Sequence, residues 1–431
     1  MENTLSFARY KDSGDSLKHF RERFLFPQHE GKNVLYFCGN SLGLQPKTTR
    51  AAIEQELDDW AKFGVEGHFN AVHPWFPYHE FLREPMAKVV GAKPEEVVVM
   101  NSLTVNLHLL MVSFYRPTKQ RYKIICEQSP FPSDQYALAT QVAFHGFDPK
   151  DAIIELAPMP GSNYISTEHI IQTIQQNKNE LALVMIGGVN YYSGQLFDMK
   201  NITTAAHLCG AIAGFDLAHA VGNVNLQLHD WNVDFAMWCS YKYLNAGPGS
   251  VGGAFINEKH AEDISIPRFA GWWGNDPKTR FTMPKKFVPV KTADAWQVSN
   301  APVFSMAALK SSLDIFTEAG MEKLVEKSRE LTGFLEFIVN EVNSKFQTPI
   351  PIAIGTKLQI ITPFNPNERG CQLSLIIKEK GKKVYDYLIK NGAIADWREP
   401  DVIRVAPVPL YNSFEDVFLL GEMIRKVMNE N

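Results

Sequence analysis

Between about residues 46 and 300, short apolar runs alternate with segments of helical periodicity, and this pattern limits the possible folds most strongly. Apolar runs of strand length lie at 97–100, 123–127, 181–187, 211–217, 235–240 and 252–257. Helical patterns lie between them, for example at 48–64, 169–179 and 202–210. Continuous apolar strands separated by helices are typical of a mostly parallel sheet covered on both faces. The predicted fold class is therefore α/β.

A smaller unit is predicted after about residue 305. A helical stretch is followed by strand-like runs, a helix, an extended segment and a last helix, at 305–345, 358–363, 372–378, 382–392, 401–410 and 413–428. A chain of 431 residues is too long for one ordinary core. The predicted organisation is a segment over 1–45 that packs with the small domain, a large domain over 46–304 and a small α+β domain over 305–431.

Charge and composition exclude several classes of protein. The net charge is −4, so no basic field favours nucleic acid or an anionic membrane as a partner. The first residues lack the apolar core of a signal peptide, and no apolar run is long enough to span a membrane. The five cysteines are scattered without a C-x-x-C pair, which favours buried structural thiols. We expect the chain to act in the cytoplasm.

Two residues at the ends of neighbouring apolar runs suggest a cofactor. Asp216 closes the run AIAGFDL, and Lys242 follows the run FAMWCS. Ligands of such sheets bind beyond the carboxyl ends of the strands. A lysine there can form a Schiff base with an aldehyde, and an aspartate can keep a ring nitrogen protonated, as pyridoxal 5′-phosphate (PLP) requires. Asp216 and His219 alone would equally fit a capped strand-to-helix turn, but Tyr241 beside Lys242 favours the cofactor.

Two further segments fit the same cofactor. Ser102 and Thr104 open a helical pattern directly after the run at 97–100, and a helix N-terminus is a natural phosphate site, although the pattern also fits a simple N-cap. Phe131 lies in the proline-bounded turn FPSD, where its ring could cover a flat ligand or pack within the loop.

Two apparent motifs are rejected. The segment GPGSVG at 247–252 matches a dinucleotide fingerprint in letters, but a strand-like run follows it where that fingerprint needs a helix. Its glycines fit a sharp turn with close backbone approach instead. His68, His73, His79 and Glu80 do not have the spacing of usual zinc ligands. No metal site is predicted.

Many blocks of the chain resemble one family. They include YFCGNSLGLQPK (36–47), WAKFGVEGHFN (60–70), NSLTVNLHLL (101–110), FPSDQYA (131–137), FDLAHAVGNV (215–224), WCSYKYLNAGPG (238–249), AGWWG (270–274), SNAP (299–302) and RVAPVPLYNSFED (404–416). With these blocks the chain resembles the kynureninase family, fold-type-I PLP enzymes of the aspartate aminotransferase superfamily. The resemblance implies a mostly parallel central sheet covered by helices, with a smaller C-terminal α+β domain.

The resemblance also implies a role for individual residues. It implies a catalytic set of Lys242, Tyr241 and Asp216, in which Lys242 forms the Schiff base and exchanges protons at the substrate. The implied cofactor-binding set is Leu103, Thr104, Phe131, Pro132, Ser133, Asp134, Asp216, His219, Tyr241, Lys242, Trp272 and Asn300. The implied substrate-binding set is His68, Asn300 and Arg404. One departure is Gly187-Gly188, where the family often has a Ser or Thr that contacts the cofactor.

The implied reaction is hydrolytic Cβ–Cγ cleavage of L-kynurenine or 3-hydroxy-L-kynurenine in tryptophan catabolism, which yields L-alanine and anthranilate or 3-hydroxyanthranilate. Arg404 would bind the substrate α-carboxylate, and Trp272 and Asn300 would come from the other subunit of a homodimer with shared active sites. His68 with Asn300 implies preference for the 3-hydroxy substrate.

Three alternatives stay open from the residues themselves. The Asp216–Lys242 pair also fits an aminotransferase or a desulfurase-like lyase, although no cysteine lies in an evident exposed loop as a desulfurase would need. From another class of protein, a catalytically silent PLP fold could serve as a binding partner.

Overall fold

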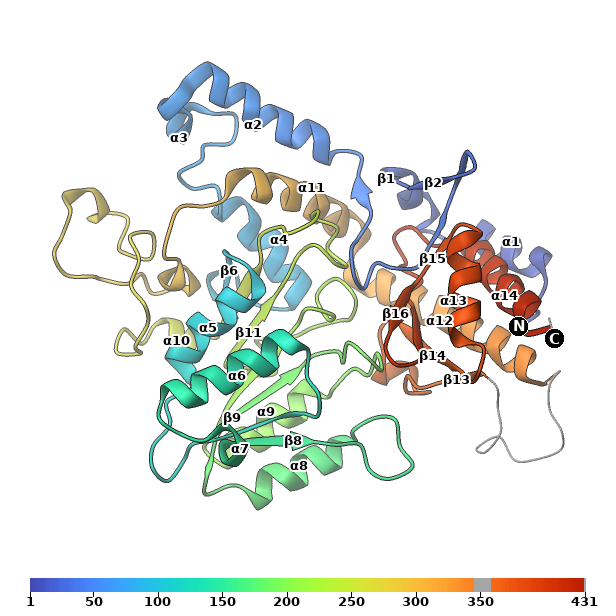
Figure 1. Ribbon diagram of the computed structural model, residues 1–431. Helices are drawn as coiled ribbons and strands as arrows, with labels where there is room; N and C mark the ends of the chain where they lie inside the picture. The colour runs from blue at the N-terminus through green and yellow to red at the C-terminus, as the bar shows by residue number, and fades with distance from the viewer. Residues whose placement is uncertain (345–357, 430–431) are drawn as a thin grey trace.

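The computed structural model describes residues 1–344 and 358–429. Its centre is a seven-stranded sheet (Figure 1). In spatial order the strands are β6 (Val97–Val99), β12 (Gly253–Ile256), β11 (Phe235–Trp238), β10 (Ile212–Asp216), β9 (Leu181–Gly187), β7 (Lys123–Glu127) and β8 (Ile153–Leu156). β12 runs antiparallel to both of its neighbours, β11 and β6, and the other strand pairs of this sheet are parallel. The mostly parallel α/β fold is thus confirmed.

Helices cover both faces of this sheet because alternate side chains of its strands point to opposite sides. Val98, Ile124 and Met185 pack in one core with α5 (Leu103–Phe114) and α6 (Pro132–Phe144). The strand residues whose side chains point to the other face of the sheet pack in a second core. The helices on that side are α2 (Thr49–Phe63), α4 (Glu80–Val90), α8 (Thr167–Gln176), α9 (Met199–Leu208) and α11 (Val303–Ala319). The shorter helices of this region are α3 (Gly67–Asn70), α7 (Pro149–Ala152) and α10 (Glu258–Ala261).

A second sheet of four strands follows in the C-terminal part of the chain. In spatial order it contains β13 (Leu358–Ile360), β14 (Leu373–Ile377), β17 (Val402–Val405) and β16 (Asp396–Arg398), all antiparallel. Helices α12 (Met321–Ser344), α13 (Gly381–Lys390) and α14 (Phe414–Asn429) accompany it. Phe334, Leu375 and Leu420 belong to a separate hydrophobic core there.

The N-terminal segment packs on this second unit (Figure 1). Helix α1 (Leu5–Gly14) lies against α14, and the Asp12 carboxylate accepts the backbone N–H groups of Phe414 and Glu415 at 2.7 and 3.0 Å. This carboxylate satisfies two donors that a helix start leaves free. The remaining short strands pair as β4 (Leu35–Tyr36) with β15 (Ala393–Ile394), β1 (Phe24–Leu25) with β5 (Gln45–Pro46), and β2 (Gln28–His29) with β3 (Lys32–Asn33).

The structure differs from the sequence prediction at three places. Strand β8 was not predicted, because IIEL is short and three of its four side chains are at least partly exposed. FPSD is not a turn: Pro132 begins α6, where a proline at the first position loses no hydrogen bond. The predicted helix over 305–345 is two helices divided at Gly320, which has a φ of 77°, and residue 345 lies outside the described residues. None of the described helices combines the length and apolar character that a bilayer crossing requires.

Candidate active site

A pocket lies at the carboxyl ends of β7, β9 and β10, as expected for a sheet of this type. Nine residues of the predicted site line it, namely Leu103, Thr104, Phe131, Ser133, Asp134, Asp216, His219, Tyr241 and Lys242. Pro132 lies between two of them as the first residue of α6. Residues from widely separated parts of the chain therefore meet at one place.

Lys242 projects into this pocket from the loop between β11 and β12. Its Nζ lies 3.1 Å from Nε2 of His219 and 5.8 Å from the centroid of the Phe131 ring. Burial and the nearby Lys242 charge lower the pKa of His219 well below its usual value. His219 is therefore neutral at physiological pH and can accept a hydrogen bond from the ammonium group.

The loop that carries Lys242 is fixed at several points. The buried Ser240 hydroxyl donates to the Val251 carbonyl, and the Lys242 carbonyl accepts the Asn245 N–H at 3.0 Å. Gly247 and Gly249 have φ values of 93° and 67°, which favour glycine. The GPGSVG segment is thus a turn that leads into β12, in agreement with the rejection of a dinucleotide fingerprint.

Asp216 and Asp134 form a buried carboxyl pair opposite the lysine. Asp216 is the last residue of β10, and its Oδ1 accepts the Ala218 N–H at 2.7 Å. Burial, followed by the charge of Asp216, raises the pKa of Asp134 well above its usual value. A side-chain hydrogen bond with Asp216 contributes to the same shift, and the Oδ1 of Asp134 has no hydrogen-bond partner among the described residues.

The N-terminus of α5 supplies an uncapped helix end to the pocket. Ser102 stands at the N-cap with an extended backbone, but its side chain makes no capping hydrogen bond. Gly252 passes close by, since a Cβ there would lie 3.2 Å from the Leu103 nitrogen. Free N–H groups and the helix dipole suit a phosphate at Leu103 and Thr104.

Arg404, on β17 of the second sheet, does not line the pocket itself but contacts a residue that does, Tyr191. Its Nη1 donates to the Tyr191 carbonyl at 2.7 Å, and Nη2 donates to the Ser41 hydroxyl at 3.1 Å and pairs with Asp396. The Nε of Arg404 is buried without a hydrogen-bond partner among the described residues. The guanidinium is thus held in place by both Nη atoms, and its Nε–H is unused.

Three predicted residues are not brought to Lys242 within one chain. His68 lies in α3 with its Nδ1 2.9 Å from the Val65 carbonyl, Trp272 is 41% exposed, and Asn300 is exposed ahead of α11. None of the three lines the pocket. A chain of aromatic contacts joins the segments of His68 and Trp272. The ring of Phe76 stacks on Phe69, which follows His68, at 6.0 Å between ring centroids and on Phe281 at 5.5 Å, and Phe281 in turn contacts the Trp272 ring.

The histidines that resembled a metal cluster turn to different partners. His73 lies 3.4 Å from a Glu56 carboxylate oxygen, and His79 lies 3.9 Å from Asp294. Burial lowers the pKa of His79 to about 4. Each of the two histidines thus lies near a different carboxylate, and its Nδ1 is buried without a hydrogen-bond partner among the described residues.

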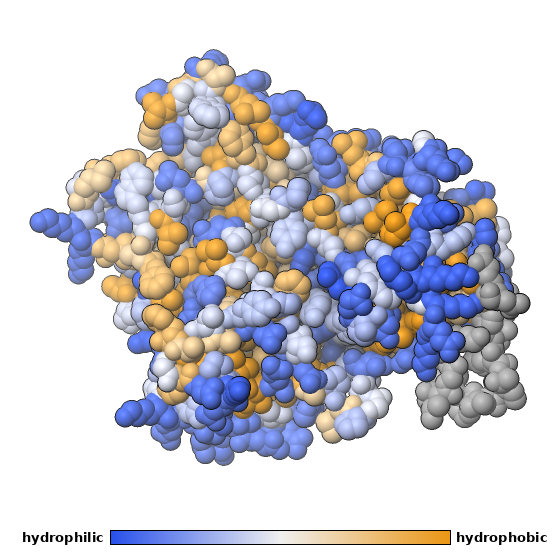
Figure 2. All heavy atoms as spheres, in the orientation of Figure 1, coloured by the Kyte–Doolittle hydropathy of each residue, from blue (hydrophilic) through white to orange (hydrophobic). Residues whose placement is uncertain are grey.

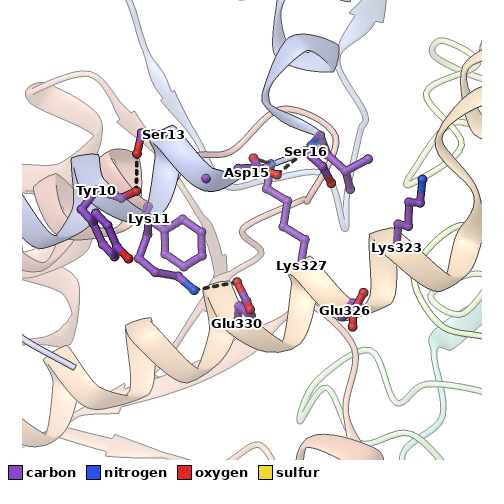
Figure 3. Close-up of a pocket in the computed structure, with 12 residues that line it drawn as sticks. Tyr10, Lys11, Ser13, Asp15, Ser16, Lys323, Glu326, Lys327 and Glu330 are labelled. Carbon is purple, nitrogen blue, oxygen red and sulfur yellow. Dashed lines mark hydrogen bonds and ion pairs between the residues drawn. The ribbon is translucent and has the colours of Figure 1, made fainter.

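A larger cavity lies elsewhere, between α1 and α12 (Figure 3). It has a volume of about 400 Å³. Its buried Lys327 pairs with Asp15 at 2.7 Å and donates to the Pro409 carbonyl. These contacts hold the N-terminal segment on α12, and the cavity contains none of the predicted site residues.

Glu127 and Tyr191 line the pocket, but the sequence prediction missed both. Glu127 is the last residue of β7, as Asp216 is the last residue of β10. The signal that identified Asp216, an acid at the carboxyl end of a buried strand, was therefore present for Glu127 too.

Comparison with known proteins agrees with this geometry. A family model described as aminotransferase class-V matches residues 35–346, and one described as the kynureninase C-terminal domain matches residues 324–424. The kynureninase of Flavobacterium psychrophilum is 55% identical over 100% of this chain and 99% of that protein. The chain belongs to the kynureninase family. The kynureninase of Nematostella vectensis is 48% identical over 97% of this chain and 92% of that protein.

Solved structures support the fold of this family member. A C-DES mutant with glycine covalently linked to its PLP cofactor has a TM-score of 0.74 at 16% identity, over 91% of this chain and 96% of that one. The apo cysteine desulfurase of Thermococcus onnurineus has a TM-score of 0.73, also at 16% identity, over 92% and 95% of the two chains. The fold-type-I architecture is confirmed, and as a member of the kynureninase family the chain is a PLP-dependent hydrolase.

Proposed function

We propose that this chain hydrolyses the Cβ–Cγ bond of L-kynurenine and 3-hydroxy-L-kynurenine in tryptophan catabolism, with L-alanine as one product. The observation that carries the proposal is Lys242 beside neutral His219 in the pocket that also contains Asp216. The sequence identity of 55% to a kynureninase over the whole chain supports the choice of substrate.

The pocket residues fit PLP. The uncapped start of α5 offers donors for a phosphate, and the orphaned Oδ1 of Asp134 offers an acceptor for a polar group of the ring. When bound, PLP supplies the electron sink that allows bonds at the substrate α- and β-carbons to break. The protein must then hold the ring, orient the substrate and move protons.

Each of these tasks has a candidate residue. Lys242 would hold the cofactor through its aldehyde group and would move protons at the substrate α-carbon, while Asp216 would keep the ring nitrogen protonated. The Phe131 ring is 41% exposed beside Lys242, so one face is free to stack on a flat ring. Burial raises the pKa of Tyr241, which keeps its hydroxyl protonated and suited to deliver a proton to Cβ.

Arg404 is the candidate for binding the substrate α-carboxylate, because its guanidinium is a fixed positive charge whose Nε–H has no acceptor among the described residues. Replacing Arg404 with lysine is expected to lower kcat/KM about 100-fold, mostly through KM, because a single ammonium group cannot keep the contacts with Tyr191, Ser41 and Asp396 and also offer a further N–H. Steady-state kinetics with kynurenine check this result. Arg398→Lys is the matched control, since Arg398 contacts the same Asp396. Equal effects of the two variants would contradict a role of Arg404 in carboxylate binding.

We further propose a homodimer in which the partner supplies Trp272 and Asn300, together with His68. Apolar side chains gather over α2 and α3 (Figure 2). They include Leu57, Trp60, Val65 and Phe69, which are 45, 56, 75 and 60% exposed. Such exposure is typical of an interaction surface. Shared sites also explain why one chain leaves these three residues far from its own pocket.

Mixing two inactive variants tests the shared site. Lys242→Ala and Trp272→Ala chains, denatured and refolded together, are expected to regain about one quarter of wild-type activity. Half of the dimers would be mixed, and one of their two sites would be intact. Each variant refolded alone is the control. If Trp272 serves its own chain, no mixed site is intact and no activity returns.

We propose cytoplasmic action, without nucleic acid or membrane as a partner, and a division of the chain into 1–45, 46–304 and 305–431. The net charge of −4 supports the first statement, and the separate hydrophobic core around Phe334, Leu375 and Leu420 supports the second.

The reaction itself is tested by incubating the PLP-loaded protein with each substrate and measuring alanine and the aromatic amine. Release of both products supports the proposal, and higher kcat/KM for 3-hydroxykynurenine supports hydroxyl recognition by His68 and Asn300. Amino transfer to a keto acid without alanine release would identify an aminotransferase instead. A protein without turnover of either kind would be the silent PLP fold.

A further inference from the structure

Glu127 is a buried acid in the cofactor pocket for which the proposed mechanism gives no role. It ends β7, is 4% exposed and lines the same pocket as Asp216 and Lys242. Both of its carboxylate oxygens lie 3.2 Å from the Gly187 nitrogen and accept that N–H. The donors to this side chain among the described residues are therefore backbone N–H groups, those of Gly187 and of Glu127 itself, and no cation pairs with it there.

The absence of a side chain at residue 187 provides the space for this carboxylate. Gly187 ends β9, and its φ lies outside the left-handed region, so the backbone conformation does not require glycine. A Cβ built there would lie 2.9 Å from Oε1 of Glu127, which is too close for real contacts. Glu127 thus occupies the space that a larger residue at 187 would fill.

This position brings the Glu127 charge close to Asp216. The strands lie in the order β7, β9, β10, and Gly187 pairs directly with Asp216. A carboxylate seated on Gly187 is therefore about one strand spacing, roughly 5 Å, from the Asp216 position. At such a distance inside a protein, like charges interact strongly.

The pocket carries more acid than base. Burial raises the pKa of Glu127 to about 7, and Asp216 adds to the effect. The other ionisable groups around it are Asp134 on α6, the Cys126 thiol on β7, and Lys242 with the neutral His219. Three carboxyl groups thus face a single ammonium among the described residues that line the pocket. Buried acid in excess destabilises the empty protein, and a cationic ligand group would relieve this cost.

We propose that Glu127 is a positioning residue of the cofactor site, which acts through Asp216. Glu127, bound to the Gly187 N–H, adds a second negative charge near Asp216. This charge strengthens the electrostatic attraction between the Asp216 site and the protonated ring nitrogen of PLP. The inference deepens the proposed function and rests on it. It also explains the glycine at position 187, because a Cβ at that position would lie too close to the Glu127 carboxylate.

Glu127→Gln tests the charge, because glutamine keeps a side-chain oxygen that can accept the Gly187 N–H. The dissociation constant of PLP, measured by titrating the apoprotein, is expected to rise about tenfold. The unfolding temperature of the apoprotein at pH 8 is expected to rise too. The sign follows from the raised pKa: the folded state loses stability as pH rises from about 4.5 through about 7, and glutamine lacks this loss.

Glu155→Gln is the matched control, since Glu155 lies opposite Cys126 on the neighbouring strand β8 and is exposed. It should leave both measurements unchanged. A purely structural Glu127 predicts the opposite pattern, a lower unfolding temperature with unchanged PLP affinity, and that result would overturn the proposal. An unchanged PLP affinity with any unfolding temperature would overturn it as well.

Gly187→Ala provides a second, independent variant, because its Cβ would displace the carboxylate without removing it. The double variant should lose less PLP affinity than the sum of the losses in the two single variants, since both changes act on the same charge. Fully additive losses would contradict the proposed contact between Glu127 and Gly187. Wild-type apoprotein that fails to bind PLP would instead refute the proposed function.

Discussion

Replacing Lys242 with alanine is expected to lower turnover of kynurenine by at least about 1000-fold, which corresponds to about 4 kcal/mol of transition-state stabilisation. In the proposed mechanism the amine of Lys242 binds the cofactor aldehyde and exchanges protons at the substrate, and burial lowers the pKa of His219 beside it and keeps His219 neutral. A neutral imidazole cannot replace a lysine as the covalent link. Alanine release, followed over time at saturating PLP, measures the effect.

The fold should survive this change. Among the described residues the Lys242 side chain makes a single hydrogen bond, to His219, and its loop is held by other contacts such as that between Ser240 and Val251. The unfolding temperature should therefore stay within a few degrees of the wild-type value. Lys310→Ala, which removes an exposed pair with Asp314, is the matched control and should keep full activity. Retained turnover in Lys242→Ala would refute the assignment of the lysine.

Replacing Asp216 with asparagine is expected to cost about 1000-fold in kcat/KM, because asparagine carries no charge to keep the ring nitrogen protonated. The amide oxygen can still accept the Ala218 N–H, so the strand end should keep its conformation. Stability should change little, since the pKa of Asp216 is raised by burial and the acid adds little to folding. Kinetics and thermal unfolding on the same preparation separate the two effects.

Asp314→Asn serves as the control for this second variant, because Asp314 is an exposed aspartate far along the chain. A loss of less than about tenfold in Asp216→Asn would show that the ring nitrogen does not depend on this residue. The variant would then favour the Asp134 carboxyl, with its unpaired Oδ1, as the group that meets the ring.

The strands of the large sheet could be predicted because most are buried on both faces and read as unbroken apolar runs. The run at 181–187 coincides with β9. Strand β8 was not predicted, because it lies at the edge of the sheet and its IIEL sequence is partly exposed. The exception in direction, β12, also could not be read from an apolar run, because such runs do not show the direction of a strand.

The site could be predicted in part, for a physical reason that differs between residues. Asp216 and Lys242 follow buried strands, and sheet geometry alone places such residues at one edge. Arg404 meets Tyr191 across 213 residues, and no local pattern reveals such a contact, so only the family resemblance identified it. His68, Trp272 and Asn300 carry no local signal of where they act, and one chain does not bring them to the pocket.

The loop between β11 and β12 has a consequence for the empty protein. Both of its ends continue into neighbouring strands of the central sheet, and Ser240, Asn245 and the two left-handed glycines fix its interior. Lys242 consequently reaches its place when the chain folds, and not when the cofactor arrives. If Lys242 holds the cofactor as proposed, little backbone conformational entropy would be lost on binding, and the free energy of capture would go into contacts and the covalent bond. The cofactor could then leave and return without any rebuilding of this loop.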